Sequence, residues 1–314
     1  MVKQAATFRR RRLPRNGQQW KKLGAVYLLM LPALLLIVIY EYIPMGGGLL
    51  IAFKDFRITR GILGSDWCGF RNFEMLFTSP FFSMVMKNTI VISLYKLVFG
   101  FPAPIILAIM LNEVRSSKVK RVFQTAYYLP HFISWVVMGG ILTNMLSADT
   151  GIVNGFIKLL GFQPIGFLTD ERYFIGTMVV SMIWKTFGYN TIIYLAALTA
   201  VDPQLYEAAT VDGAGRWKQL FHITLPCIMS TIIVMLIMRI GSLMQAGFEQ
   251  IFVLYHPGVY GTADIIDTYV YRAGLQDGKF ELAAAVGLFK SVINFVLIIV
   301  ANKLARMAGE EGVY

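Results

Sequence analysis

Four basic side chains interrupt long apolar stretches of the sequence, at Lys96, Lys185, Arg239 and Lys290. No Asp or Glu lies in the same stretches to pair with them. Charged groups inside a bilayer are costly, and they usually face a cavity, a partner or the interface. These cations therefore favour the binding of an anionic solute along a water-filled path. Some of them could instead contact another subunit or snorkel to the interface, and snorkelling is expected for Lys96.

A second group of side chains has the chemistry of sugar recognition, which requires planar apolar faces and forked hydrogen-bonding groups. Its members cluster in two neighbouring apolar stretches, and core packing explains many of them equally well. We therefore predict a region rather than individual contacts. The predicted substrate pathway consists of Trp184, Lys185, Phe187, Tyr189, Asn190, Arg239, Gln245, Phe248, Glu249 and Lys290.

Residues that could catalyse a reaction are missing from the places where an enzyme or a motor needs them. The phosphate-binding motif G-x-x-x-x-G-K-[ST] is absent, and His131, His222 and His256 lie in three separate regions. A proton-coupled carrier needs carboxylates in the middle of its spans, but Glu249 and Glu281 lie at the ends of apolar stretches. The sequence predicts no catalytic residue, no metal site and no cofactor in this chain, and it argues against a secondary carrier.

The composition, with 56% hydrophobic and 15% charged residues, is that of an integral membrane protein. A helix needs about 20 apolar residues to cross the hydrocarbon core. Six stretches meet or approach this length, so we predict an all-α fold with six transmembrane helices. Pro102, Pro104, Pro130 and the Gly139–Gly140 pair predict bent or discontinuous helices. The six stretches are Leu23–Tyr40, Asn88–Leu111, Val122–Leu146, Tyr173–Val201, Cys227–Phe248 and Leu282–Lys303.

The distribution of basic residues predicts the orientation. Eight of the 29 Lys and Arg residues precede Leu23, which places the N-terminus in the cytoplasm by the positive-inside rule. An even number of spans then places the C-terminus on the same side. The first apolar stretch is not followed by a small-residue cleavage site, so we expect it to remain as a span. We expect a basic cytoplasmic segment at 1–22, a transmembrane domain at 23–305 and a short cytoplasmic tail at 306–314.

A polar loop, from Asp202 to Pro226, separates the fourth and fifth stretches. Asp202 can cap a short helix that begins with Pro203, and Gly213 supplies the backbone freedom that ends this helix. A second short helix after Gly215 then leads into the next apolar stretch. The loop predicts a helix–turn–helix on the cytoplasmic side, with a shallow surface that another protein could approach. A plain connection between spans and a nucleic-acid reader are the alternatives.

Seven residues of this loop keep fixed spacings: Glu207, Ala208, Ala209, Gly213, Ile223, Leu225 and Pro226. They reproduce the pattern EAA-x3-G-x9-I-x-LP, and the chain thereby resembles the permease subunits of binding-protein-dependent ABC importers. Stretches such as YLPHFISWVVMGGIL from Tyr128 and GFEQIFVLY from Gly247 look like the LplB-type oligosaccharide branch of that family. This branch includes permeases for polygalacturonan, rhamnogalacturonan and alginate fragments. The likeness covers nearly the whole chain after about Leu23.

The resemblance implies a non-catalytic permease with a maltose-permease-like fold in the cytoplasmic (inner) membrane of a bacterium. It implies a second, distinct permease subunit, two ATP-binding subunits that hold ATP and Mg, and an extracytoplasmic solute-binding protein as partners. The outer loops Lys54–Lys87 and Glu249–Glu281 are rich in aromatic residues, which suits either docking of the binding protein or an interfacial belt. The implied ATPase-coupling residues are Glu207, Ala208, Ala209, Asp212, Gly213 and Gly215.

The predicted cargo is an acidic oligosaccharide that contains uronic acids, such as an alginate or pectin fragment. Two observations favour it: the cations inside the apolar stretches and the resemblance to permeases for acidic oligosaccharides. A neutral or lipid-linked cargo is the alternative for the substrate. A membrane scaffold without a transport path is the alternative for the function.

Overall fold

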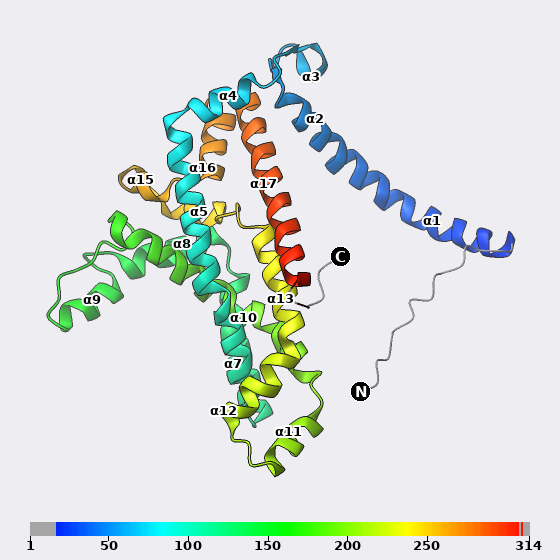
Figure 1. Cartoon of the computed structure of the whole chain (residues 1–314). Helices are drawn as coiled ribbons and strands as arrows, with labels where there is room; N and C mark the ends of the chain where they lie inside the picture. Colours follow the sequence, from blue (N-terminus) through cyan, green and yellow to red (C-terminus); the bar gives the residue numbers. More distant parts are fainter. Residues whose placement is uncertain (1–16, 308, 310–314) are drawn as a thin grey trace.

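The computed structural model describes residues 17–307 and 309, and this part of the chain is built almost entirely from helices (Figure 1). Within it, the strands are β1 (Lys54–Asp55) and β2 (Asp66–Trp67), which pair antiparallel with Lys54 opposite Trp67. The prediction of an all-α fold is confirmed. Much of the predicted basic segment at 1–22 and of the predicted tail at 306–314 lies outside the described residues.

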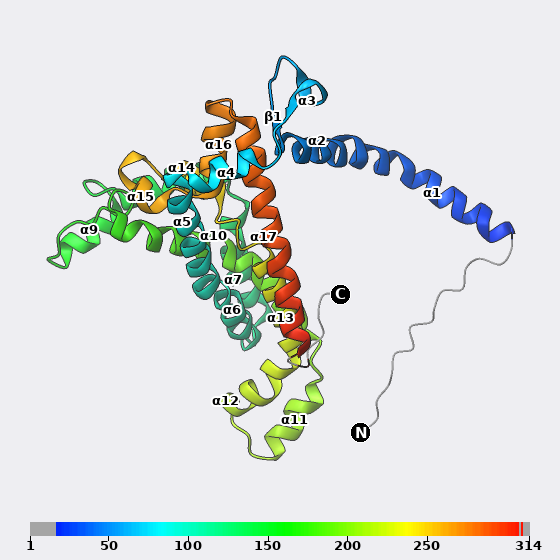
Figure 2. The same cartoon turned by 45° about the horizontal axis from the view of Figure 1, so that its top comes forward.

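A long apolar rod precedes the helical bundle. α1 (Gly17–Ile37), a π-helical turn (Val38–Tyr42) and α2 (Ile43–Ile51) follow one another without a break, and the predicted first span lies within them. α1 stands apart from the bundle, and α2 approaches α17 (Figures 1 and 2). Side chains along the rod are exposed, such as Leu29 at 82%. A surface this apolar requires lipid or another subunit around it.

The bundle itself is arranged around one long helix, α10, which packs against α5, α6 and α13. Apolar side chains fill these contacts: Leu107 and Leu111 of α6 are buried together with Tyr194 and Leu198 of α10. α5 and α6 form one run that is interrupted at Pro102, where proline removes a helical hydrogen bond. The long helices are α5 (Pro80–Gly100), α6 (Pro102–Asn112), α10 (Glu171–Thr199), α13 (Leu225–Gly241) and α17 (Phe280–Met307).

The described residues contain four helical segments that could cross a membrane by length and apolar composition alone. A fifth is counted if Ser117–Phe132 and Trp135–Leu146, which meet at 103°, form one broken span. α10 corresponds to the fourth predicted span but is not in this set, because polar residues interrupt its 29 residues. Six transmembrane helices therefore stay a prediction. The four segments are Val26–Ile51, Pro80–Asn112, Arg216–Gly241 and Phe280–Met307.

The third predicted span is broken at a proline. α7 (Ser117–Tyr128) and α8 (Trp135–Leu146) are separated by a 3-10 turn (Leu129–Phe132) that contains Pro130. The predicted discontinuity at Pro130 is confirmed. The Gly139–Gly140 pair, by contrast, lies inside the continuous helix α8.

The fifth predicted span, Cys227–Phe248, is interrupted as well, and its predicted end at Phe248 is wrong, although the helical segment Arg216–Gly241 is long enough to span. α13 ends at Gly241, and α14 (Phe248–Leu254) begins only after a non-helical turn. Gly247 has φ +95° in this turn, a conformation that L side chains rarely adopt. The glycine therefore sets the direction in which the chain leaves the break.

The short elements lie mostly at the two ends of the bundle (Figure 1). At one end are α11 (Pro203–Val211), α12 (Arg216–Gln219) and a π-helical turn (Leu220–Thr224). At the opposite end are α3 (Gly61–Gly64), α4 (Arg71–Thr78) and α16 (Ile266–Tyr271), which is followed by a π-helical turn (Arg272–Gln276). The remaining short elements are α9 (Ile152–Leu159), a 3-10 turn (Pro257–Val259) and α15 (Tyr260–Ala263).

Candidate functional site

The EAA loop, which we define as residues 202–226, has the local structure that its sequence predicts. Asp202 accepts a hydrogen bond from a backbone N–H of the first turn at 2.9 Å, and Pro203 opens α11. Gly213 follows the end of α11 with φ +72°. The predicted helix–turn–helix is confirmed, except that α12 continues through the π-helical turn directly into α13.

Side chains tie the two short helices of the EAA loop into one unit. Gln219 Nε2 donates to Thr210 Oγ1 and to the carbonyl of Ala214, both at 3.0 Å. The hydroxyl groups of Tyr206 and Thr224 lie 3.0 Å apart. Because Thr224 immediately precedes α13, this contact joins α11 to the start of that long helix.

The predicted coupling residues lie at the surface of the EAA loop. Large apolar side chains accompany them, since Val211 is 88% and Trp217 75% exposed. Exposed apolar groups that cluster in this way mark a surface that another molecule covers. The exposed coupling residues are Glu207, Ala208, Asp212, Gly213 and Gly215, and Ala209 is half-buried.

A cavity of about 720 Å³ lies between the EAA loop and α6. Met110 of α6 and Trp217 of the loop line it, and Glu113 and Arg216 form an exposed ion pair of 3.8 Å beside it. Exposed ion pairs of this kind contribute little to stability. This ion pair therefore does little to hold the EAA loop against α6.

Lys185 of α10 lies at the break in the third predicted span. It is 8% exposed, and its ammonium group donates to the carbonyls of Pro130, His131 and Ile133. The regular hydrogen bonding of the helix stops here, and a bilayer has no water to bind the backbone carbonyls that are left without a helical partner. An ammonium group has three donors, so all of them are used. That Lys185 contributes to a substrate pathway stays a prediction. The hydrogen bonds of its ammonium group go to the protein backbone.

Lys96 of α5 lies at the break in the fifth predicted span. It is 6% exposed and donates to the carbonyl of Ala246 at 2.7 Å and to Gln250 Oε1. Gln250 in turn donates to the carbonyl of Met178 at 2.7 Å and to Ser181 Oγ at 2.8 Å, which joins the break to α10. The expected snorkelling of Lys96 is wrong, because these buried acceptors hold its ammonium group inside the bundle.

The two remaining cations differ in their partners. Lys290 forms an ion pair with Asp267 of α16, so the expectation that all four cations lack an acidic partner is wrong here. Asp267 lies outside the apolar stretches, and only the fold brings it to Lys290. Arg239 forms no ion pair among the described residues, where its polar contact is the sulfur of Met182 at 3.9 Å.

The structure brings only part of the predicted substrate pathway together. Asn190 and Arg239 line a cavity of about 270 Å³ between α6, α10 and α13. Arg239 and Gln245 also line an adjoining cavity of about 80 Å³, together with Ser93 and Lys96. Sequence reasoning missed Ser93, although it precedes Lys96 by three residues and such spacing places two side chains on the same helical face.

The other predicted pathway residues do not border these two cavities. Tyr189 stacks on His131 with ring centroids 3.9 Å apart, and Phe187 packs edge-on against Tyr127 at 5.4 Å. Packing within the described chain therefore explains these two aromatic rings. Trp184 and Glu249 are exposed. Phe248 stacks on Phe252, and Lys290 is paired with Asp267.

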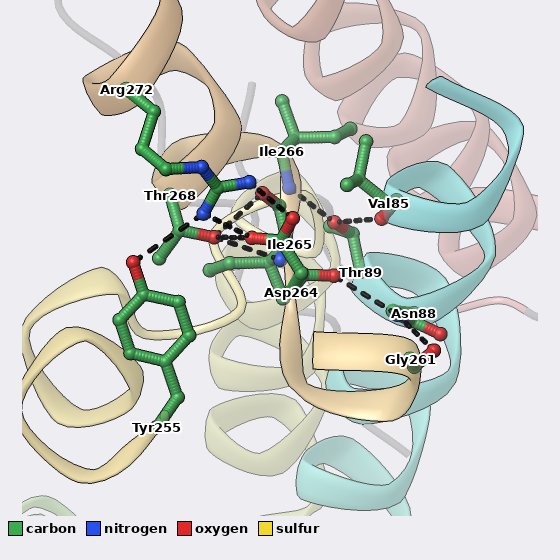
Figure 3. Close-up of polar contacts among 10 residues, drawn as sticks. All are labelled: Val85, Asn88, Thr89, Tyr255, Gly261, Asp264, Ile265, Ile266, Thr268 and Arg272. Carbon is green, nitrogen blue, oxygen red and sulfur yellow. Dashed lines mark hydrogen bonds and ion pairs between the residues drawn. The ribbon is translucent and has the colours of Figure 1, made fainter. Parts of the chain in front are cut away.

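At the end of the bundle opposite the EAA loop, a polar network fixes the chain around α16 (Figure 3). Asp264 is 3% exposed and accepts hydrogen bonds from Arg272 and, at 2.6 Å, from Thr268. Asn88 of α5 donates to the carbonyls of Gly261 and Asp264 at 3.0 and 3.1 Å. The hydrogen bond to Asp264 raises the pKa of Arg272, and this charge-assisted contact ties the start of α16 to the turn that follows it.

Broken apolar helices, buried cations at the breaks and a polar loop at one end of the bundle are typical of a subunit of a membrane transporter. Comparison with known families makes this specific. Residues 100–308 match the model of the binding-protein-dependent transport system inner membrane component, and the chain belongs to this family.

Two curated relatives and one solved structure narrow the likeness. The polygalacturonan/rhamnogalacturonan transport system permease protein YteP of Bacillus subtilis (strain 168) is 46% identical over 92% of this chain and 90% of its own length. Protein LplB of the same organism is 46% identical over 92% and 91%. A chain of a bacterial alginate ABC transporter, crystallised with an alginate pentasaccharide-bound periplasmic protein, superposes with a TM-score of 0.87 at 41% identity, covering 96% of this chain and 100% of its own length. The resemblance to LplB-type permeases is confirmed.

Proposed function

We propose that this permease moves acidic oligosaccharides, rich in uronic acids, inward across the cytoplasmic membrane. Its family and its 46% identity with a polygalacturonan/rhamnogalacturonan permease make it a permease of an oligosaccharide ABC importer. The name of the relative prints polygalacturonan and rhamnogalacturonan, and the name of the solved transporter prints alginate, all of which are polymers that contain acidic sugars. An acidic cargo is therefore common to these similar proteins.

One observation on this chain carries the assignment of an acidic cargo. Arg239 lies in the last turn of α13, lines two neighbouring cavities and forms no ion pair among the residues that the structure describes. A guanidinium group stays charged at any pH that a cell reaches, and it is expensive to keep uncompensated in a membrane. An anionic solute that passes through these cavities would supply the missing charge.

The rest of the transporter follows from the same proposal. Six transmembrane helices with both termini in the cytoplasm would place the EAA loop on the cytoplasmic side, where its exposed apolar surface would meet an ATP-binding subunit. ATP and Mg would be held by two such subunits, and this chain would be non-catalytic. The exposed rod of α1 and α2 supports a second permease as neighbour. The face around α16, where the network of Figure 3 lies, would receive the solute-binding protein.

Movement of the EAA loop would drive the change of access. Its two short helices are tied to each other and run directly into α13. Closure of the ATP-binding subunits would therefore move α13, which lines the cavity of about 270 Å³, as a rigid body. Arg239 lies at the far end of the same helix. The cavities would then be opened alternately to the outside and to the cytoplasm.

The test is ATP hydrolysis by the purified complex in liposomes, with the binding protein present. A panel of acidic oligosaccharides is compared with neutral oligosaccharides of the same length. Stimulation by uronic-acid oligomers is the expected result. Stimulation by neutral sugars alone would support an importer but contradict the acidic cargo. The chain would then be a permease for neutral oligosaccharides, which is the alternative function.

A further inference from the structure

The break in the fifth predicted span encloses a small cavity that is lined by hydrogen-bond donors. α5 contributes Ser93 and Lys96, and the end of α13 with the following turn contributes Arg239, Ser242 and Gln245. The cavity measures about 80 Å³ and shares Arg239 and Ser242 with the cavity of about 270 Å³ next to it. Arg239 and Ser242 are therefore within reach of a group in either cavity.

Two cations give this cavity a positive charge. The ion pairs within the described part of the chain involve neither Lys96 nor Arg239. Lys96 uses two of its three donors, on Ala246 and Gln250. Arg239 has five N–H donors, and its polar contact among the described residues is a sulfur at 3.9 Å. Donors are thus available on both side chains.

Ser93 gives a second, independent indication that a ligand belongs here. Its side chain is only 5% exposed, yet its hydroxyl oxygen has no hydrogen-bond partner among the described residues. Buried hydroxyl groups nearly always have a partner, because water is no longer there to satisfy them. The described lining of the cavity contains no carboxylate, so its donors have no anion of the chain to bind.

We propose that this cavity, which we call the Ser93–Lys96–Arg239 site, binds one carboxylate group of the oligosaccharide as the sugar passes the helix break. A carboxylate accepts several hydrogen bonds and matches the planar fork of a guanidinium group. The site deepens the proposed function and rests on it, because it assigns the recognition of acidic charge to one place in the chain. An inorganic anion from solution would satisfy the same donors, so the test must separate these two sources.

The experiment measures stimulated ATP hydrolysis by the complete complex in liposomes with the binding protein. The probes are an acidic oligosaccharide and its carboxyl-reduced form, which has the same length and lacks only the negative charges. Arg239→Gln removes the charge, Arg239→Lys keeps it, and Ser93→Ala removes only the hydroxyl group. Lys158→Gln is the matched control, since it removes an exposed charge on α9, far from the site in the sequence and outside both cavities.

We expect Arg239→Gln to raise the half-maximal concentration of the acidic probe about tenfold, since a charge-assisted hydrogen bond is lost. Arg239→Lys should recover most of this loss, and Ser93→Ala should cost about threefold. The half-maximal concentration of the carboxyl-reduced probe should rise less with each substitution. Lys158→Gln should leave the half-maximal concentrations of both probes unchanged.

Equal losses for the acidic and the carboxyl-reduced probe would overturn the proposal, because the site would then hold a solution anion or serve packing alone. Unchanged values in both Arg239→Gln and Ser93→Ala would overturn it as well. If Arg239→Gln fails to assemble, Ser93→Ala decides, because both charges remain. A wild-type complex that responds only to neutral sugars would refute the proposed function itself, which is a different outcome from an acidic response that ignores these substitutions.

Discussion

Two predicted spans of this permease are broken, and each break has a buried lysine from a neighbouring helix beside it. At the third span, Lys185 donates all its N–H groups to three backbone carbonyls. At the fifth span, Lys96 donates to a carbonyl and to Gln250, while Arg239 and Ser93 keep donors without a described acceptor. The comparison teaches that the count of satisfied donors, not the presence of a cation, separates a structural charge from a binding one.

The largest effect is expected when the satisfied lysine is removed. Lys185→Met would leave the carbonyls of His131 and Ile133 at the third break without this donor, and unsatisfied buried polar groups cost about 1–3 kcal/mol each. The carbonyl of Pro130 would keep its hydrogen bond from the N–H of Ile133. We expect a large fall in the thermal midpoint of the detergent-solubilised protein and a low yield of assembled complex. Lys158→Met, which removes an exposed lysine, is the control and should change neither. If the Lys185→Met protein were as stable as wild type, the claim that Lys185 is a structural charge at the third break would be wrong.

A smaller effect is expected from a methyl group at the fifth break. A Cβ at Gly247 would lie 2.9 Å from Lys96 Nζ, and its φ of +95° disfavours every L residue by about 1–2 kcal/mol. Gly247→Ala should lower the thermal midpoint moderately and weaken the response to acidic oligosaccharides, because Lys96 is displaced.

The matched control for this substitution is Gly140→Ala, inside helix α8. A Cβ there meets nothing within 4 Å, so the change should be neutral or slightly stabilising. The same loss of acidic response in both variants would show that the fifth break has no special role.

A third substitution lies outside both breaks and sharpens the comparison. Gly213 has φ +72° and open space around it, so Gly213→Val strains only the backbone of the EAA loop, by about 1–2 kcal/mol. Stimulated ATP hydrolysis should fall by the same factor for acidic and carboxyl-reduced sugars, with little change in thermal midpoint.

Gly155→Ala in the exposed helix α9 is its control, since Gly155 lies outside the EAA loop, has no positive φ and a Cβ there meets nothing within 4 Å. A change in the ratio of the two sugars in Gly213→Val would mean that the EAA loop influences substrate choice. That result would contradict the assignment of this choice to the helix break.

The local parts of this structure could be predicted from the sequence, and the long-range parts could not. The cap at Asp202, the turn at Gly213 and the discontinuity at Pro130 depend on residues next to each other in the chain. The acceptors of Lys185 lie more than fifty residues away, and those of Lys96 about 150. No periodicity or spacing reports such pairs, because helix packing decides which backbone a long side chain reaches.

The break in the fifth span also could not be predicted from the sequence. A glycine in an apolar stretch, such as Gly247, is tolerated in many transmembrane helices, so it did not distinguish a continuous span from a broken one. Arg239 and Gln245, which stood out as polar residues in an apolar stretch, line the same cavity, and their part in a substrate pathway stays a prediction. Ser93 was missed because a serine in a helix usually satisfies itself on the preceding turn.

The most direct test of the central claim is uptake of oligosaccharide into proteoliposomes by wild-type and Arg239→Gln complexes at equal amounts of assembled transporter. The quantity to measure is the ratio of uptake of an acidic oligosaccharide to uptake of its carboxyl-reduced form. If the fifth break binds the carboxylate of the cargo, this ratio falls about tenfold in Arg239→Gln and returns toward the wild-type value in Arg239→Lys. An unchanged ratio in Arg239→Gln would contradict the account.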